Sequence, residues 1–145
     1  MSKSKALKKF RASLATFVSR LFTSAATSDI LYDGNFCRFV EAWLTSLSSS
    51  KIRSFRHTAT VVSLMIVSAL CEVSVSVNKD FAQASRAKEA EEKKGRKDKA
   101  RLKDLTKNVT DIHDKKTQLE EYLDDMFNRC APRAGLDRAL RSDRG

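Results

Sequence analysis

Apolar residues recur at steps of three and four positions along most of this chain, a spacing that places their side chains on one face of an α-helix. The first stretch extends from residue 7 to residue 25 and ends at the polar run Thr27-Ser28-Asp29. The second extends from residue 36 to residue 47, between the turn-forming Asp33-Gly34-Asn35 and three consecutive serines at positions 48–50. This pattern predicts two amphipathic helices joined by a turn.

The third stretch is the most apolar part of the chain. Residues 57–71 contain no Asp, Glu, Lys or Arg, and Glu72 follows them. A membrane span needs about 20 apolar residues, whereas this segment is shorter and contains His57 and several hydroxyl side chains. We therefore expect a helix at the centre of a bundle, with a membrane span as the alternative. Residues 73–77 alternate Val with Ser, as a strand would, but their flanks follow the helical pattern and favour a helix.

From residue 79 onward the chain becomes highly charged. Residues 88–101 are almost purely charged around Gly95, and an apolar stripe with coiled-coil-like spacing follows, broken only at Lys116. Because Gly is a poor helix former, we predict a helical hairpin over about residues 79–128 with its tip near Gly95. The alternative is one unbroken helix, since a single Gly costs only about 1 kcal/mol. Residues 129–145 contain Pro132 and little apolar content, and are expected to form an irregular or disordered tail.

The composition supports an all-α fold. The 145 residues include only four Gly and one Pro, too few for the many turns of a β-sandwich or barrel. We therefore predict a helical bundle of residues 1–128 with a long protruding charged hairpin. The periodicity further predicts a single core that contains Phe17, Leu21, Phe39, Trp43, Leu64 and Leu70.

The chain lacks the sequence motifs of common catalytic and cofactor chemistry. Its three cysteines are far apart, and its two histidines, His57 and His113, belong to no metal-binding motif. It contains neither a glycine-rich phosphate-binding loop nor an HExxH motif. We expect His57 to be a packing or capping residue. The sequence therefore predicts a protein that is not an enzyme and needs no cofactor or metal.

The charge balance indicates a polyanionic partner. Lys and Arg total 28 against 18 Asp and Glu, so the formal net charge is +10, which favours contact with nucleic acid. Such contacts would be with phosphates and independent of base sequence. The alternatives are a solvated helix end for the tip and an intramolecular contact for Arg56, because the first helical turn is unfavourable for a cation. The candidates are Lys51, Arg53 and Arg56 at the start of the third helix, and Lys93, Lys94, Arg96, Lys97, Lys99 and Arg101 at the tip.

The start of the third helix carries a distinctive order of side chains. Phe55-Arg56-His57-Thr58 is followed by a small residue, Thr60 and an apolar helix. This run resembles the signature of the STAG domain, which is found in the stromal-antigen subunits of cohesin. The similarity extends to Phe10-Arg11, to Leu31-Tyr32-Asp33, to the run from Trp43 to Ser49, to Gly95-Arg96-Lys97 and to Met126-Phe127-Asn128.

The resemblance implies a HEAT-like, non-catalytic helical subunit of cohesin that acts in sister-chromatid cohesion and chromosome segregation. It implies kleisin and the other cohesin subunits as partners, sequence-independent contact with double-stranded DNA, a nuclear location on chromatin and no membrane. Residues 129–145 do not resemble the aromatic and Arg-rich turn that follows in the family, so the chain resembles the STAG module alone. The alternative is a basic amphipathic protein of a membrane surface or an organelle, suggested by the basic first helix and the apolar third one.

Overall fold

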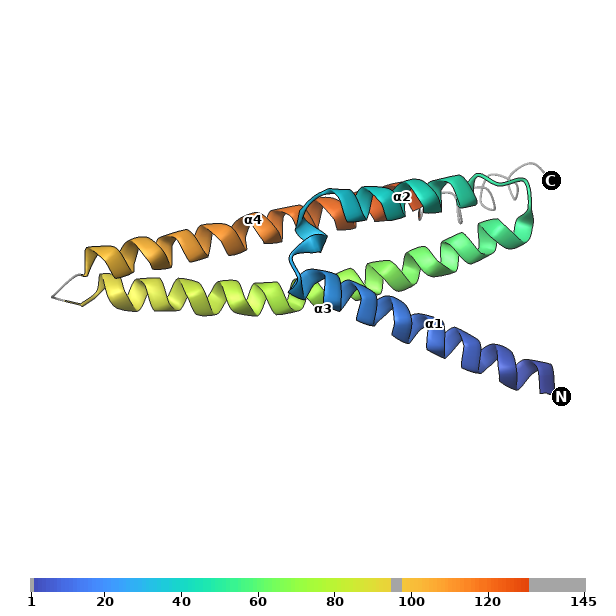
Figure 1. The fold of residues 1–145 in the computed structure, drawn as a ribbon, viewed down its shortest axis with the longest axis horizontal. Helices are drawn as coiled ribbons and strands as arrows, with labels where there is room; N and C mark the ends of the chain where they lie inside the picture. The colour runs from blue at the N-terminus through green and yellow to red at the C-terminus, as the bar shows by residue number, and fades with distance from the viewer. Residues whose placement is uncertain (1, 95–97, 131–145) are drawn as a thin grey trace, which may run out of the picture.

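The computed structural model describes residues 2–94 and 98–130, and its regular elements are all helical (Figure 1). The all-α prediction is therefore confirmed. The elements are α1 (Ser2–Thr27), the short 3-10 helix η1 (Ile30–Tyr32), α2 (Asn35–Ser48), α3 (Arg53–Glu92) and α4 (Lys99–Cys130).

Helix α3 is the axis of the structure, and α1, α2 and α4 all contact it. Its 40 residues span about 60 Å at 1.5 Å per residue. Helix α4 runs antiparallel beside it, and α2 lies near the carboxyl-terminal part of α4, whereas α1 crosses α3 and diverges from it toward the N-terminus (Figure 1). The part of the α3–α4 pair that leads to the α3–α4 connection extends beyond α1 and α2 (Figure 1).

The predicted turn before α2 is present and has a clear physical basis. Gly34 has φ +80°, a left-handed conformation that a side chain would strain. Asp33 precedes it, and its Oδ1 accepts hydrogen bonds from the backbone N–H groups of Asn35 (2.9 Å) and Phe36 (3.4 Å). These bonds satisfy donors that the first turn of α2 leaves open. The turn reverses the chain, so α2 packs against both α3 and α4.

The core prediction is wrong for five of its six residues, because only Leu70 is buried. Leu64, for example, is 55% exposed. The buried positions of α1 include Val18 and Phe22, each one residue beyond a predicted position, and one residue turns a helix by about 100°. The apolar face of each helix covers more of its circumference than the part that contacts other helices. The periodicity therefore identified the apolar face but not which side of that face is buried. The exposed residues among the six are Phe17, Leu21, Phe39, Trp43 and Leu64.

Helices α3 and α4 are separate, because α3 ends at Glu92 and α4 begins at Lys99. The Oδ1 atom of Asp98 accepts hydrogen bonds from the N–H groups of residues 100 (3.1 Å) and 101 (3.4 Å) and so caps α4. Lys116 interrupts the apolar stripe of α4, yet its Nζ lies 5.7 Å from the ring centroid of Phe81 on α3, a cation–π distance. The predicted tip at Gly95 lies outside the described residues, as do tail residues 131–145.

By length and composition alone, α3 could also cross a membrane. An 18-residue window within it has a mean hydropathy of 2.0, and 33% of that window is buried in the fold. The buried side chains of this helix include Ile66, Ala69 and Leu70, which belong to the same core as residues of α1, α2 and α4.

Candidate nucleic-acid and partner interface

The three basic candidates at the start of α3 do not have equivalent environments. Lys51 and Arg53 are exposed to solvent. The Nη1 atom of Arg56 instead donates hydrogen bonds to the backbone carbonyls of Ser50 (2.9 Å) and Lys51 (3.0 Å). These contacts close the loop between α2 and α3 and offset the unfavourable position of a cation in the first turn. The intramolecular alternative for Arg56 is therefore observed.

At the other end of α3, two candidates share one buried carboxylate. The Nζ of Lys94 lies 2.6 Å from Oε2 of Glu91, and the Nε of Arg101 lies 3.6 Å from the same atom. Lys93 and Lys99 are exposed, and neither forms an ion pair with a described residue. Arg96 and Lys97 lie outside the described residues. Glu91 therefore offsets part of the positive charge that the sequence places here.

The structure does not bring the two groups of basic candidates together. One group lies at the first turn of α3 and the other beyond its last turn, so the length of this helix, about 60 Å, separates them. The predicted DNA-contacting residues therefore form two patches rather than one surface. A single duplex would need about 18 base pairs to extend over that distance, at 3.4 Å of rise per pair.

Sequence reasoning missed two lysines that adjoin the second patch. Lys103 and Lys107 follow Lys99 at steps of four, so all three lie along one face of α4. They line a shallow cavity of about 460 Å³ together with Leu102, Thr106 and Thr110. We call Lys99, Lys103 and Lys107 the lysine ridge. The spacing was visible in the sequence, within the second helix of the predicted hairpin, but Lys103 and Lys107 were not among the candidates.

The residues that resemble the STAG signature lie on the first two turns of α3. Phe55 is half exposed, and His57 is exposed, so the packing role expected for that histidine is wrong and a capping role stays a prediction. The hydroxyls of Thr58 and Thr60 donate to the carbonyls four residues earlier, at 2.9 and 3.0 Å. The signature thus forms an exposed surface around the Arg56 contact with the α2–α3 loop.

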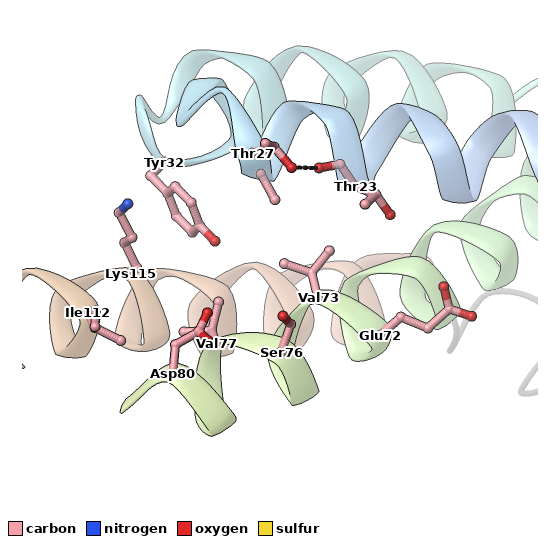
Figure 2. Close-up of a pocket in the computed structure, with 11 residues that line it drawn as sticks. Thr23, Thr27, Tyr32, Glu72, Val73, Ser76, Val77, Asp80, Ile112 and Lys115 are labelled. Atoms are coloured by element: carbon pink, nitrogen blue, oxygen red, sulfur yellow. Dashed lines mark hydrogen bonds between the residues drawn. The ribbon is translucent and has the colours of Figure 1, made fainter. Parts of the chain in front are cut away.

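A separate groove lies between α1, η1, α3 and α4 (Figure 2). It encloses about 410 Å³ and combines apolar side chains with hydroxyls and carboxylates. Its lining residues are Thr23, Ala26, Thr27, Tyr32, Glu72, Val73, Ser76, Val77, Asp80, Ile112 and Lys115.

The charged groups of this groove are not evenly paired. Lys115 lies 2.6 Å from the carboxylate of Asp29, whereas Glu72 accepts a hydrogen bond only from the Ser19 hydroxyl, at 3.0 Å, among the described contacts. Burial raises the pKa of Tyr32 above its ordinary value, and the negative charges of Asp29 and Asp80 raise it further. The groove is therefore electronegative on a chain of net charge +10. Within the part of the chain that the structure describes, no group of three or more His, Cys, Asp or Glu side chains could hold a metal ion.

Comparison with known proteins places these features in a family. Residues 1–108 match the STAG domain. The chain is 32% identical over 127 residues to cohesin subunit psc3 of Schizosaccharomyces pombe, covering 88% of this chain and 13% of that protein. It is 36% identical over 88 residues to cohesin subunit scc-3 of Caenorhabditis elegans, with 61% and 8% covered, and 30% identical over 122 residues to human cohesin subunit SA-3, with 83% and 10% covered. The chain thus spans about a tenth of the length of these relatives, and it belongs to the STAG domain family.

Proposed function

We propose that this chain acts as the STAG module of a cohesin subunit, in sister-chromatid cohesion and chromosome segregation. The observation that carries the proposal is the STAG match over residues 1–108, together with relatives that are themselves cohesin subunits. The role is non-catalytic, in keeping with membership of this family. The partners are the kleisin and other cohesin subunits, and the location is chromatin in the nucleus.

Exposed aromatic residues on α2 support a scaffolding role. Phe39 is 76% exposed and Trp43 is 56% exposed. Large apolar side chains grouped on a surface mark sites of protein–protein contact, and aromatic residues are enriched at the centres of such contacts. These two residues, four positions apart on one helix, are therefore proposed to contact a cohesin subunit.

The second part of the proposal is contact with the DNA backbone. The lysine ridge presents three ammonium groups on one face, and Lys93 adds a fourth exposed cation near the end of α3. Lysines on a helix face contact phosphates rather than base edges, so binding is independent of sequence and weakens with salt. The ridge is favoured over the start of α3, because there Arg56 donates to loop carbonyls.

Quantitative purification from cells tests the cohesin assignment. The tagged chain is expressed in cells of the organism that encodes it, crosslinked to its partners and purified. Mass spectrometry then quantifies the kleisin and the other cohesin subunits in the purified sample. We expect these subunits to be enriched, and to be lost when Phe39 and Trp43 are replaced by Ser. Val75→Ser, a change at another exposed apolar position on α3, is the matched control and should retain them. Absence of cohesin subunits from the unmodified sample would contradict the proposal.

The apolar window of α3 favours one competing function, a protein of a membrane surface. Flotation with vesicles of neutral and anionic lipid separates the two. A cohesin module stays at the bottom of the gradient in 0.15 M salt without detergent, whereas a membrane-surface protein rises with the vesicles. Flotation with neutral vesicles would favour the membrane function, because it cannot arise from the positive charge alone.

A further inference from the structure

The groove between α1, α3 and α4 already holds one cation of the chain itself. At one end, the Nζ of Lys115 lies 5.2 Å from the centroid of the Tyr32 ring and 2.6 Å from Oδ1 of Asp29. An aromatic face and a carboxylate together hold an ammonium group well. Figure 2 shows Lys115 and Tyr32 side by side at this end. An aromatic ring and a carboxylate at this end of the groove therefore already bind one cationic side chain, that of Lys115.

The remaining carboxylates of the groove have no such cation. Glu72 and Asp80 both belong to α3 and line the groove, and neither forms an ion pair with a described residue. They are eight residues apart, which separates them by about 12 Å along the helix. Between them, Val73 and Val77 provide an apolar floor. The groove thus alternates a carboxylate, an apolar floor and a second carboxylate.

We propose that this groove is a docking site for an extended segment of a partner protein that carries two Lys or Arg side chains about 12 Å apart. In an extended chain, two residues four positions apart are separated by about 13 Å, which matches the spacing of Glu72 and Asp80. The aliphatic stems of Lys and Arg pack on apolar surface while their charged ends reach a carboxylate. The valine floor and the two acidic positions fit this combination.

Charge complementarity selects this occupant over others. The chain as a whole carries +10, so an electronegative groove contrasts with its surroundings and repels phosphates while it attracts cationic groups. The tail of this chain also contains arginines, at positions 133, 138, 141 and 144, but with two aspartates among them. We assign the groove to a partner because no two of these tail arginines stand four positions apart, the spacing that matches the two carboxylates. The proposal does not depend on the cohesin assignment or on DNA binding.

Binding of a defined peptide to the full chain tests the proposal. The probe is a fluorescein-labelled seven-residue peptide with two arginines four positions apart and alanine or leucine between them, followed by anisotropy at about 0.05 and 0.15 M salt. We expect saturable binding that weakens with salt. The same peptide with citrulline in place of both arginines keeps the shape but loses the charge, and should not bind.

Three variants locate the binding. Glu72→Gln combined with Asp80→Asn removes both charges with little change of shape and should weaken binding roughly tenfold. Ser76→Trp leaves both carboxylates in place but fills the groove, and should weaken binding by a similar factor. Asp104→Asn removes one exposed carboxylate outside the groove and is the matched control. Circular dichroism melting of each variant establishes that it remains folded.

Four outcomes would overturn the proposal. If the peptide fails to bind both the unmodified chain and the chain without residues 131–145 at millimolar concentration, the groove is not a site for this chemistry. Binding that survives in Ser76→Trp, or that Asp104→Asn weakens equally, reveals diffuse charge attraction instead of docking. If binding appears only after residues 131–145 are removed, and a peptide of that sequence binds in its place, the occupant is the tail of this chain and not a partner.

Discussion

The Oε2 atom of Glu91, in the last turn of α3, lies 3.6 Å from the Nε of Arg101 in the first turn of α4. The Glu91 side chain is only 7% exposed, and the same oxygen lies 2.6 Å from the Nζ of Lys94. A buried carboxylate between two cations is expensive to uncover and joins the ends of two helices. Some of the charges near this connection therefore hold the two helices together, whereas Lys93 and Lys99 form no ion pair with a described residue.

This arrangement predicts that Glu91→Gln destabilises the chain. The variant keeps the size of the side chain but leaves two cations without their carboxylate, so the free energy of unfolding should fall by about 1 kcal/mol. The estimate is modest because both cations are more than half exposed. Urea unfolding measures it, with Glu92→Gln as the control, since that residue is exposed and lies 3.9 Å from Lys88. Equal losses in the two variants would show that burial of Glu91 has no special effect.

The second prediction separates buried from exposed leucines on α3. Leu70 is 1% exposed and belongs to the core, so Leu70→Ala should cost on the order of 2–5 kcal/mol of unfolding free energy. Leu64, on the same helix, is 55% exposed, and Leu64→Ala should cost less than about 1 kcal/mol. Thermal or urea unfolding of both variants provides the comparison. A larger loss for Leu64 than for Leu70 would mean that Leu64, and not Leu70, lies on the buried face of α3.

The sequence was sufficient for the helices but not for their buried edges. Steps of three and four positions locate an apolar arc, and the arcs of α1 and α2 were located correctly. Which edge of an arc is buried depends on the angle at which a helix meets its neighbour, and that angle is a tertiary property. Phe22 is therefore buried while Leu21, at the next position, is 38% exposed. Leu70 was predicted correctly and Leu64, on the same helix, was not, so the apolar stretch located α3 in the core but did not identify its buried face.

The positive charge of the candidate site could be predicted from the sequence, but the partners of its individual basic side chains could not. The excess of Lys and Arg near the start of α4 was evident from composition, yet nothing in the sequence shows that Lys94 and Arg101 share Glu91. Similarly, the contact of Arg56 with the carbonyls of Ser50 and Lys51 depends on how the α2–α3 loop folds back. The groove could not be predicted at all, because its lining comes from four elements that are far apart in the chain.

A third prediction concerns the reactivity of two cysteines. Cys37 is buried, and burial together with the nearby charges of Asp33 and Glu41 raises its pKa to about 12. Cys71 is exposed. In the folded chain at pH 8, a short iodoacetamide pulse should therefore modify Cys71 and spare Cys37, because the thiolate is the reactive form. Peptide mass spectrometry identifies the sites, and unfolding in urea is the control in which both residues should react.

The same shift predicts a dependence of stability on pH. The pKa of Cys37 is higher in the folded chain than in the unfolded chain, so the folded state favours the neutral thiol. Its contribution to stability is fully present below about pH 9 and is lost as the pH rises toward 12. Cys37→Ala removes the titrating group and should flatten this part of the profile between about pH 9 and 12. A profile that is equally steep in the variant would assign the loss to other groups.

The final prediction concerns the lysine ridge and DNA. Replacing Lys99, Lys103 and Lys107 by Glu changes the charge of one face by six units, and no residue of the predicted or observed core is altered. Lys94 and Arg101 are left intact because they pair with Glu91. At about 0.1 M salt, where charges act over roughly 10 Å, we expect this variant to lose most binding to a duplex of any sequence. Fluorescence anisotropy with two unrelated duplexes of equal length measures the loss.

The matched control is Lys51→Glu combined with Arg53→Glu, which alters the exposed cations about 60 Å away while leaving Arg56 in its loop contact. Binding to a 12-base-pair duplex should remain nearly unchanged in this control, because a duplex of about 41 Å, at 3.4 Å per pair, cannot reach both ends of α3. A ridge variant that binds like the unmodified chain, together with a control that does not, would move the DNA surface to the start of α3. If the unmodified chain fails to bind DNA even at about 50 mM salt, DNA contact is not part of its function. The proposed function would then consist of contact with cohesin subunits alone.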